Sequence, residues 1–339
     1  MHDEQLKATA NRMVANGKGL LAADESNGTI GKRFEAVGVE NTHENRRAYR
    51  ELLFTAPDIA EGISGVIMYD ETFRDTASTG ASFVSLLESA DVLPGIKVDE
   101  GTEPMDGSPE EKVTKGLESL SSRMPEYAEL GAKFAKWRAV ITIGEGIPTD
   151  ANLTENARRL AAYAKICQEN GIVPIVEPEV LMDWSNGQAE CEAVSERNLT
   201  HVFAALRAAD VLIEGMILKT NMMVPGKESG ETKTPEEVAE ATLRVFTKVL
   251  PPGLPGQMFL SGGQSELEAT ENLAAMHARG PLPWKLSFSY GRALQKGALE
   301  AWRGMPENVP AAQAAFLHRA KMNRLAALGR YTKEAEAKA

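Results

Sequence analysis

Residues 172–180 read IVPIVEPEV, an apolar run whose two charged residues, Glu177 and Glu179, fall in its second half. A run of this length, rich in valine and isoleucine, is typical of a strand buried on both faces of a parallel sheet. Comparable runs recur, each followed by a turn-rich stretch and a helical pattern, at residues 19–24, 65–70, 95–99, 134–143, 215–221, 257–263 and 284–291. Eight strands alternating with helices predict an α/β protein, a (β/α)8 TIM barrel formed as a single domain.

The predicted barrel spans residues 1–329 and ends with a helix. Thr234 followed by Pro235 and two glutamates is a helix start, and the alanine-rich stretch 309–328 is a final helix stopped by Gly329. Residues 330–339 are polar and are expected to form a flexible C-terminal tail. A doubly wound sheet is the competing architecture, but no Gly-x-Gly-x-x-Gly turn follows the first strand.

Composition narrows the class of protein. Of the 339 residues, 43% are hydrophobic, yet no stretch of 18 uncharged apolar residues exists, so no membrane span is expected. Lysine and arginine total 37 against 48 acidic residues, a net charge of −11 that disfavours nucleic-acid binding. An anionic substrate would need a local group of cations. Two cysteines and no export or transit signal at the start predict reduced thiols in the cytoplasm.

Histidines and cysteines give no sign of a metal site. No two histidines lie within 40 residues of each other, and neither a His-x-x-x-His nor a Cys-x-x-Cys motif occurs. We therefore expect no catalytic metal and no cofactor, and proton chemistry that uses carboxylates, lysines or tyrosines.

Charged residues gather in the later halves of the predicted strands, where barrels place their active sites. Side chains two residues apart in a strand point to the same face. Glu177 and Glu179 are therefore expected on one face of their strand, and Lys136 and Arg138 on one face of theirs. Neighbouring strands then bring Lys136, the two glutamates and Lys219 together inside the barrel. A buried lysine beside a carboxylate can form a Schiff base, with the carboxylate as general acid or base. An ion network that only fills the barrel is the alternative, and spacing does not choose between the two lysines.

Two glycine-rich turns follow the last two predicted strands, where barrels commonly bind phosphate. They read Ser261-Gly262-Gly263-Gln264 and Ser289-Tyr290-Gly291-Arg292, and the arginine adds a bidentate donor. The loop that begins at Asp24 offers a further acid/base group and, at Ser26 and Thr29, hydroxyls for a second phosphate. A plain helix cap at Ser26 or Asn27 is the alternative for this loop.

Residues 11–331 resemble the class I (Schiff-base) fructose-1,6-bisphosphate aldolase family. The resemblance rests on the ordered motifs LAADESNGTIGKR (21–33), GIKVD (95–99), FAKWR (134–138), IVEPE (175–179), ILKTNMMVPG (217–226), FLSGGQSE (259–266) and SYGRALQ (289–295). It implies that Lys219 is the Schiff-base lysine. It also implies Glu177 as general acid/base with Glu179 as its partner, Lys136 at the C4 region of the substrate, and Asp24 at the C4 hydroxyl.

The same resemblance implies two phosphate-binding groups and a homotetramer. One group comprises Ser261, Gly262, Gly263, Ser289, Gly291 and Arg292, and the other comprises Ser26, Thr29, Arg33, Lys97 and Arg138. The expected reaction is reversible cleavage of fructose 1,6-bisphosphate to dihydroxyacetone phosphate and glyceraldehyde 3-phosphate. A Schiff-base aldolase for fructose 1-phosphate or another ketose phosphate is an alternative, as is a non-catalytic scaffold that binds sugar phosphates. Members with a catalytic terminal tyrosine differ from this chain, which ends in Glu-Ala-Lys-Ala.

Overall fold

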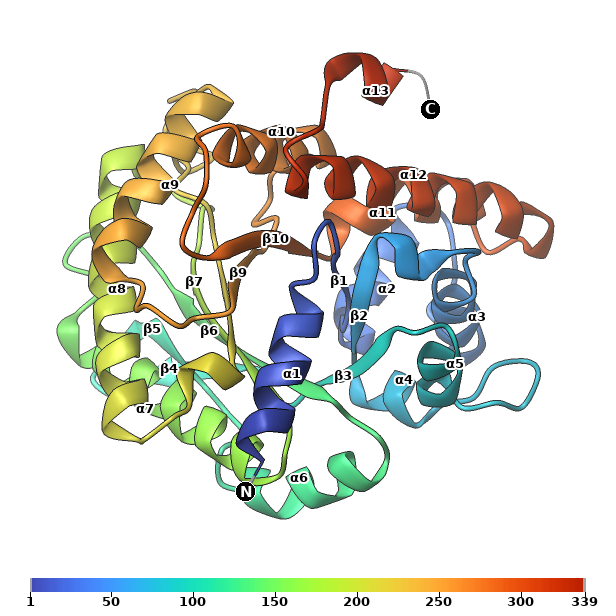
Figure 1. Cartoon of the computed structure of the whole chain (residues 1–339), viewed down its shortest axis with the longest axis horizontal. Helices are drawn as coiled ribbons and strands as arrows, with labels where there is room; N and C mark the ends of the chain where they lie inside the picture. Colours follow the sequence, from blue (N-terminus) through green and yellow to red (C-terminus); the bar gives the residue numbers. More distant parts are fainter. Residues whose placement is uncertain (1, 338–339) are drawn as a thin grey trace.

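A closed parallel barrel of eight strands lies at the centre of the computed structural model, which describes residues 2–337 (Figure 1). The order around the barrel is β1, β2, β3, β6, β7, β8, β9, β10 and back to β1. These strands are β1 (Gly19–Ala23), β2 (Ile63–Met68), β3 (Leu93–Lys97), β6 (Phe134–Ile141), β7 (Val173–Val180), β8 (Ile217–Thr220), β9 (Gly256–Phe259) and β10 (Lys285–Tyr290). The predicted (β/α)8 fold is confirmed.

Helices surround the barrel, and most begin where the sequence provides a cap. They are α1 (Asp3–Met13), α2 (Asn27–Glu35), α3 (His43–Phe54), α4 (Asp70–Arg74), α5 (Phe83–Ser89), α6 (Leu120–Glu129), α7 (Asp150–Glu169), α8 (Gln188–Ala208), α9 (Pro235–Val249), α10 (Glu266–His277), α11 (Arg292–Trp302), α12 (Val309–Ala327) and α13 (Lys333–Ala337). Thr234 and Glu237 form a capping box at α9, as the sequence predicts. None of these helices, within residues 2–337, has the length and apolar character to cross a membrane.

The barrel interior is filled by apolar side chains below the charged layer. Phe134 lies against Gly65 and Gly95, and a Cβ at Gly95 would sit only 2.2 Å from the Phe134 ring. Only glycine leaves room for that ring. Leu6 and Met13 of α1 belong to the same apolar cluster, so α1 closes the amino-terminal end of the barrel, and Figure 1 shows it lying across that end. The opposite end is left for the charged residues.

Each of the eight predicted strands differs from the structure by one to four residues at one or both ends, and the largest difference is at β9, which stops at Phe259 rather than at Gly263. The second run was expected to end at Asp70, but β2 stops at Met68 and Asp70 begins α4. An aspartate is favoured in the first turn of a helix because it complements the helix dipole. The third strand was expected at residues 95–99, but β3 runs from Leu93 to Lys97, two residues earlier at both ends, and includes Pro94.

An antiparallel hairpin that the sequence analysis did not predict follows β3. It comprises β4 (Thr102–Met105) and β5 (Ser108–Thr114). The dipeptide Asp106-Gly107 joins the strands, with Gly107 at a φ of 78°, and this pair is a recognised hairpin signal. Glu111 of the hairpin accepts hydrogen bonds from the backbone N–H and the hydroxyl of Thr149, the residue that caps α7.

The described part of the C-terminal tail contains a short helix, α13, after Gly329 ends α12 with a φ of 64°. Glu336 accepts hydrogen bonds from Arg319 and contacts His318 Nε2 at 3.2 Å, so the segment is tied to α12. Residues 338 and 339 lie outside the described residues. The flexibility of the tail stays a prediction, and these contacts are what a mobile tail would have to break.

Candidate active site

A pocket of about 1140 Å³ opens where the barrel strands end, on the side away from α1. Its walls include every residue that the sequence analysis assigned to a site: Asp24, Ser26, Thr29, Arg33, Lys97, Lys136, Arg138, Glu177, Glu179, Lys219, Ser261, Gly262, Gly263, Ser289, Gly291 and Arg292. The structure therefore brings together residues from seven different strands or the turns that follow them. This is the end of the barrel at which such folds place their chemistry.

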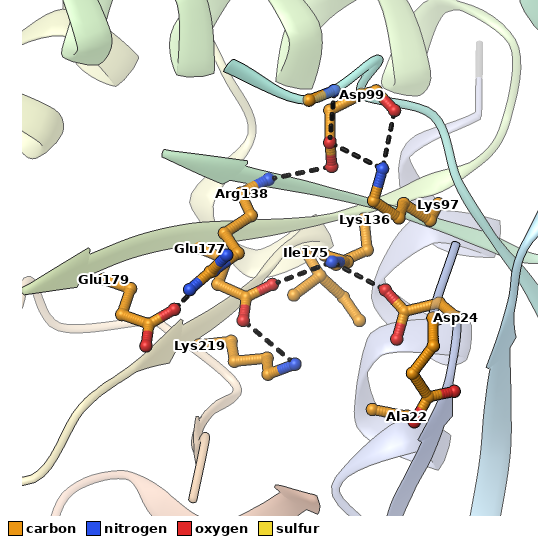
Figure 2. Close-up of polar contacts among 12 residues, drawn as sticks. Ala22, Asp24, Lys97, Asp99, Lys136, Arg138, Ile175, Glu177, Glu179 and Lys219 are labelled. Atoms are coloured by element: carbon orange, nitrogen blue, oxygen red, sulfur yellow. Dashed lines mark hydrogen bonds and ion pairs between the residues drawn. The ribbon is translucent and has the colours of Figure 1, made fainter. Parts of the chain in front are cut away.

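Glu177 lies between the two lysines at the centre of the pocket (Figure 2). Its Oε1 is 3.1 Å from Lys219 Nζ, and its Oε2 is 3.4 Å from Lys136 Nζ. The second contact lacks hydrogen-bond alignment, and Oε2 is buried with no hydrogen-bond partner among residues 2–337. All three side chains are almost fully buried. An oxygen in this position is available to a ligand that enters the pocket.

Strand register explains how Lys136 reaches this layer from the early part of its strand. Lys136 pairs with Ile175, one layer below the level at which Arg138 pairs with Glu177. The long lysine side chain spans that layer and ends between Glu177 and Asp24. Residue 177 is one step beyond the pair Val176 and Leu218, which brings it level with Lys219.

Asp24 follows β1 and points at Lys136, with its Oδ2 2.7 Å from the lysine Nζ (Figure 2). Burial by itself would raise the pKa of Asp24, but the charges of Lys136 and Lys219 outweigh it and hold that pKa well below its usual range. Burial would likewise lower the pKa of Lys136, but Asp24 and Glu177 outweigh it and raise that pKa well above its usual range. Asp24 is therefore ionised and Lys136 protonated at neutral pH.

Most of the other cations at the pocket are already paired with a carboxylate. Arg138 donates to Glu179, Arg33 donates to Glu25, and Lys97 Nζ lies 2.7 Å from Asp99 Oδ1. Glu179, which the resemblance implies as the partner of Glu177, forms its ion pair with Arg138, and its part in catalysis stays a prediction. These ion pairs hold the guanidinium and ammonium groups in fixed positions. Because each carboxylate offsets the charge of its cation, the pairs attract an anionic ligand less than unpaired cations would.

Arg292 differs from those cations because it has no carboxylate within ion-pair distance in the described chain. It is the first residue of α11, directly after Gly291, and it lines the pocket. Ser289 lies two residues before Gly291, and its hydroxyl oxygen is buried with no hydrogen-bond partner among residues 2–337. An unpaired guanidinium and an unpaired buried hydroxyl in one place favour an anionic ligand.

The other glycine turn faces the same part of the pocket. Gly262 and Gly263 have φ values of 53° and 92°, and such left-handed conformations strain other residues. Ser261 O accepts a hydrogen bond from the backbone N–H of Gln264 at 2.8 Å, which closes the turn. The turn presents backbone without side chains to the pocket, which allows an anion to approach closely.

In the loop after β1, the prediction that Ser26 caps a helix is confirmed. Ser26 is the N-cap of α2, and its hydroxyl accepts a hydrogen bond from the backbone N–H of Thr29. The hydroxyl groups of Ser26 and Thr29 lie 3.1 Å apart, and both residues line the pocket. Capping does not prevent them from binding a ligand, because each hydroxyl has further hydrogen-bonding capacity.

Several pocket residues escaped the sequence analysis. Tyr69, Arg123 and Tyr127 line one side, while Asp183 and Lys227 line the side near the Ser261 turn. These residues lie in loops and helices beyond the strands, so strand periodicity does not point to them. Within residues 2–337, no group of three or more histidine, cysteine, aspartate or glutamate side chains is arranged to hold a metal ion.

Comparisons with known proteins agree on one family. The model of the glycolytic family described as fructose-bisphosphate aldolase class-I matches residues 5–339. A probable fructose-bisphosphate aldolase class 1 of Xanthomonas campestris is 51% identical over 332 residues, 98% of this chain and 99% of that protein. The cytosolic fructose-bisphosphate aldolase 4 of Arabidopsis thaliana is 51% identical over 333 residues, 98% of this chain and 85% of that protein. A crystal structure of the Plasmodium falciparum fructose-bisphosphate aldolase, solved with TRAP and an inhibitor, superposes with a TM-score of 0.96 at 47% identity, covering 97% of this chain and 96% of that one.

Proposed function

Because this chain belongs to the class I fructose-bisphosphate aldolase family, we propose a specific role for each group of residues in its pocket. The protein is a carbon–carbon lyase that reversibly cleaves fructose 1,6-bisphosphate to dihydroxyacetone phosphate and glyceraldehyde 3-phosphate. The observation that carries the residue assignment is the placement of Glu177 between two buried lysines, Lys136 and Lys219. Only Lys136 has a second carboxylate, Asp24, within ion-pair distance among residues 2–337. The direct test of the reaction is release of triose phosphate from fructose 1,6-bisphosphate by the purified protein.

Lys219 is the nucleophile. A lysine attacks a carbonyl only as the neutral amine, and Lys136 is kept protonated by two carboxylates, Asp24 and Glu177. Lys219 has a single carboxylate, Glu177, within ion-pair distance in the described part of the chain. Lys136 instead acts as a fixed positive charge, which polarises the substrate near its C4 oxygen.

The remaining steps follow from the two carboxylates. Glu177 first takes a proton from the Lys219 ammonium group 3.1 Å away, which leaves a neutral amine that adds to the C2 carbonyl to form a carbinolamine. Glu177 then gives that proton to the departing hydroxyl, so that water leaves, an iminium forms and Glu177 is again a carboxylate. Asp24 takes the proton of the C4 hydroxyl as the C3–C4 bond breaks, and the bonding electron pair moves into the iminium to give an enamine. Glyceraldehyde 3-phosphate leaves, and the proton that Asp24 accepted is returned to C3 of the enamine, which becomes an iminium again. Water hydrolyses this iminium, which releases dihydroxyacetone phosphate and frees Lys219.

The two phosphates bind on opposite sides of Lys219. C1 is bonded to C2, so its phosphate lies beside the Schiff base, and β9 is the strand that pairs with β8 through Lys219 and Met258. We therefore assign the C1 phosphate to the turn after β9 with Ser289, Gly291 and Arg292. The C6 phosphate is assigned to Ser26, Thr29, Arg33 and Lys97, with Arg138 nearby.

Replacing Arg292 with alanine should lower kcat/KM for fructose 1,6-bisphosphate by about 10- to 150-fold while the fold survives. Loss of a hydrogen bond to a charged group costs about 1.5–3 kcal/mol, and Arg292 has no carboxylate partner in residues 2–337 that would be stranded by its removal. Steady-state cleavage rates measure the effect. The matched control is Lys296→Ala, which removes an exposed cation from the same helix outside the pocket and should leave kcat/KM unchanged. Equal values for Arg292→Ala and wild type would show that the phosphate binds elsewhere.

Chelation should leave the activity intact. The iminium accepts the electrons of the breaking C3–C4 bond, so the mechanism gives a metal ion no task. Cleavage rates before and after dialysis against EDTA check this. A loss of activity that added zinc reverses would contradict it.

Two further assignments rest on relatives rather than on the pocket. The Arabidopsis relatives carry cytosolic names, and we assign this protein to the cytoplasm. The resemblance to class I aldolases also favours a homotetramer, which analytical ultracentrifugation of the full chain tests.

A further inference from the structure

Lys227 lies in the loop after β8, and backbone hydrogen bonds fix its position. Its N–H donates to Met182 O at 2.9 Å, and the N–H of Glu228 donates to Trp184 O at 3.2 Å. These bonds join the loop after β8 to the loop after β7, over the mouth of the pocket. The lysine side chain therefore projects from an anchored backbone rather than from a free loop.

The side chain of Lys227 extends over the Ser261–Gly263 turn. A Cβ placed on Gly263 would lie 2.5 Å from Lys227 Nζ and 2.6 Å from its Cε, so only a glycine lets the lysine pack this closely. Lys227, Gly262, Gly263 and Arg292 all line the pocket. Lys227, from the loop after β8, thus supplies a positive charge beside the turn after β9, and Arg292 supplies another after β10.

Asp183 holds the ammonium group in the empty pocket, with its Oδ1 3.0 Å from Lys227 Nζ. The Lys227 and Asp183 side chains are 45% and 61% exposed, and ion pairs so open to water contribute little stability. A phosphate dianion presents more negative charge and more acceptor oxygens than one carboxylate does. The ammonium group needs only a rotation about its side-chain bonds to exchange one partner for the other.

We propose that Lys227 is a further substrate-binding residue whose ammonium group contacts the phosphate held at the Ser261–Gly263 turn, and that Asp183 holds it in place until substrate arrives. The inference rests on the proposed function, because it takes the C1 phosphate as the ligand of that turn. A protein with a net charge of −11 repels anionic substrates, so a cation kept at the mouth of the pocket also favours their entry.

The test compares Lys227→Ala with wild type on two substrates and on inorganic phosphate as a competitive inhibitor. Fructose 1,6-bisphosphate and fructose 1-phosphate both carry the C1 phosphate. The variant should raise KM for both by about the same factor, near tenfold or about 1.4 kcal/mol, with kcat within about twofold. The inhibition constant of phosphate should rise similarly. An unchanged inhibition constant, or a KM effect confined to the bisphosphate, would overturn the assignment.

Three variants separate binding from other causes. Lys227→Arg should recover the wild-type KM within about threefold, because a guanidinium also binds phosphate. Asp183→Asn should lower the phosphate inhibition constant by about two- to threefold, because the competing carboxylate is gone. Weaker phosphate binding in Asp183→Asn would contradict its holding role. Lys233→Ala, which removes a cation of the same loop outside the pocket, is the control and should match wild type.

Calorimetric titration of the full-length protein with inorganic phosphate distinguishes failure of this inference from failure of the proposed function. Weaker phosphate binding in Lys227→Ala would support the contact even if wild type did not cleave fructose 1,6-bisphosphate. Equal phosphate binding in an active wild type and in Lys227→Ala would reject the contact and leave the aldolase mechanism intact.

Discussion

Replacing Lys219 with alanine should abolish both turnover and covalent labelling. Borohydride reduces an imine to a stable amine, so wild type treated with dihydroxyacetone phosphate and borohydride should carry the label on Lys219. The variant should carry none, and its cleavage rate should fall by at least about a thousandfold, or about 4 kcal/mol, because the covalent route is lost. Peptide mapping by mass spectrometry locates the label, and a coupled assay measures the rate.

Lys136 provides the decisive comparison for this result. Lys136→Met removes the other buried lysine but keeps a side chain of similar length, so the label on Lys219 should persist while cleavage slows. Far-ultraviolet circular dichroism of each variant confirms that the barrel is intact. A label found on Lys136 in wild type, or a Lys219→Ala protein that is still labelled, would contradict the assignment of the nucleophile.

The barrel could be predicted from the sequence because its signals are local. Buried parallel strands appear as short apolar runs, and a charged residue such as Glu177 or Lys219 stands out within them. Side chains two residues apart point to the same face of a strand, and successive strands of the barrel are neighbours. These two rules were enough to predict that these residues share one face. The resulting prediction that Lys136, Glu177 and Lys219 meet is confirmed by the ion pairs between them.

The pairing of these charges could not be predicted, because it depends on register and on side-chain reach. Which lysine has two carboxylates was open until the structure placed Asp24 beside Lys136. Lys97 was expected to line the second phosphate site, but its ion pair with Asp99, two residues later in the chain, was not predicted. Lys227 could not be found at all, because its approach to Gly263 depends on how two loops pack together.

Asp24→Asn should separate cleavage from Schiff-base formation. The substitution keeps the size of the side chain but removes the charge 2.7 Å from Lys136 Nζ and the base for the C4 hydroxyl. Removal of a general base costs about 10²- to 10⁴-fold, so kcat for cleavage should fall by about that factor. Lys219 and Glu177 remain in contact, so borohydride should still label Lys219 with dihydroxyacetone phosphate. Loss of the label together with the activity would mean that Asp24 acts before the C3–C4 bond breaks.

The free energy of unfolding of this variant gives a second measure of the Asp24–Lys136 pair. The pKa of Asp24 in the folded protein lies well below 3.8, the ordinary value for an aspartate. A carboxyl group with a lowered folded pKa stabilises the fold above its unfolded pKa, and this contribution disappears as pH falls toward the folded value. Asp24→Asn should therefore be less stable than wild type to urea at pH 7, and the difference should shrink as pH falls below about 4. A constant difference between pH 7 and pH 3 would show that the charge of Asp24 does not stabilise the barrel. Three results together would assign both roles to Asp24, holding Lys136 and accepting the C4 proton. They are a fall in kcat, a variant less stable than wild type at pH 7, and a label that remains on Lys219.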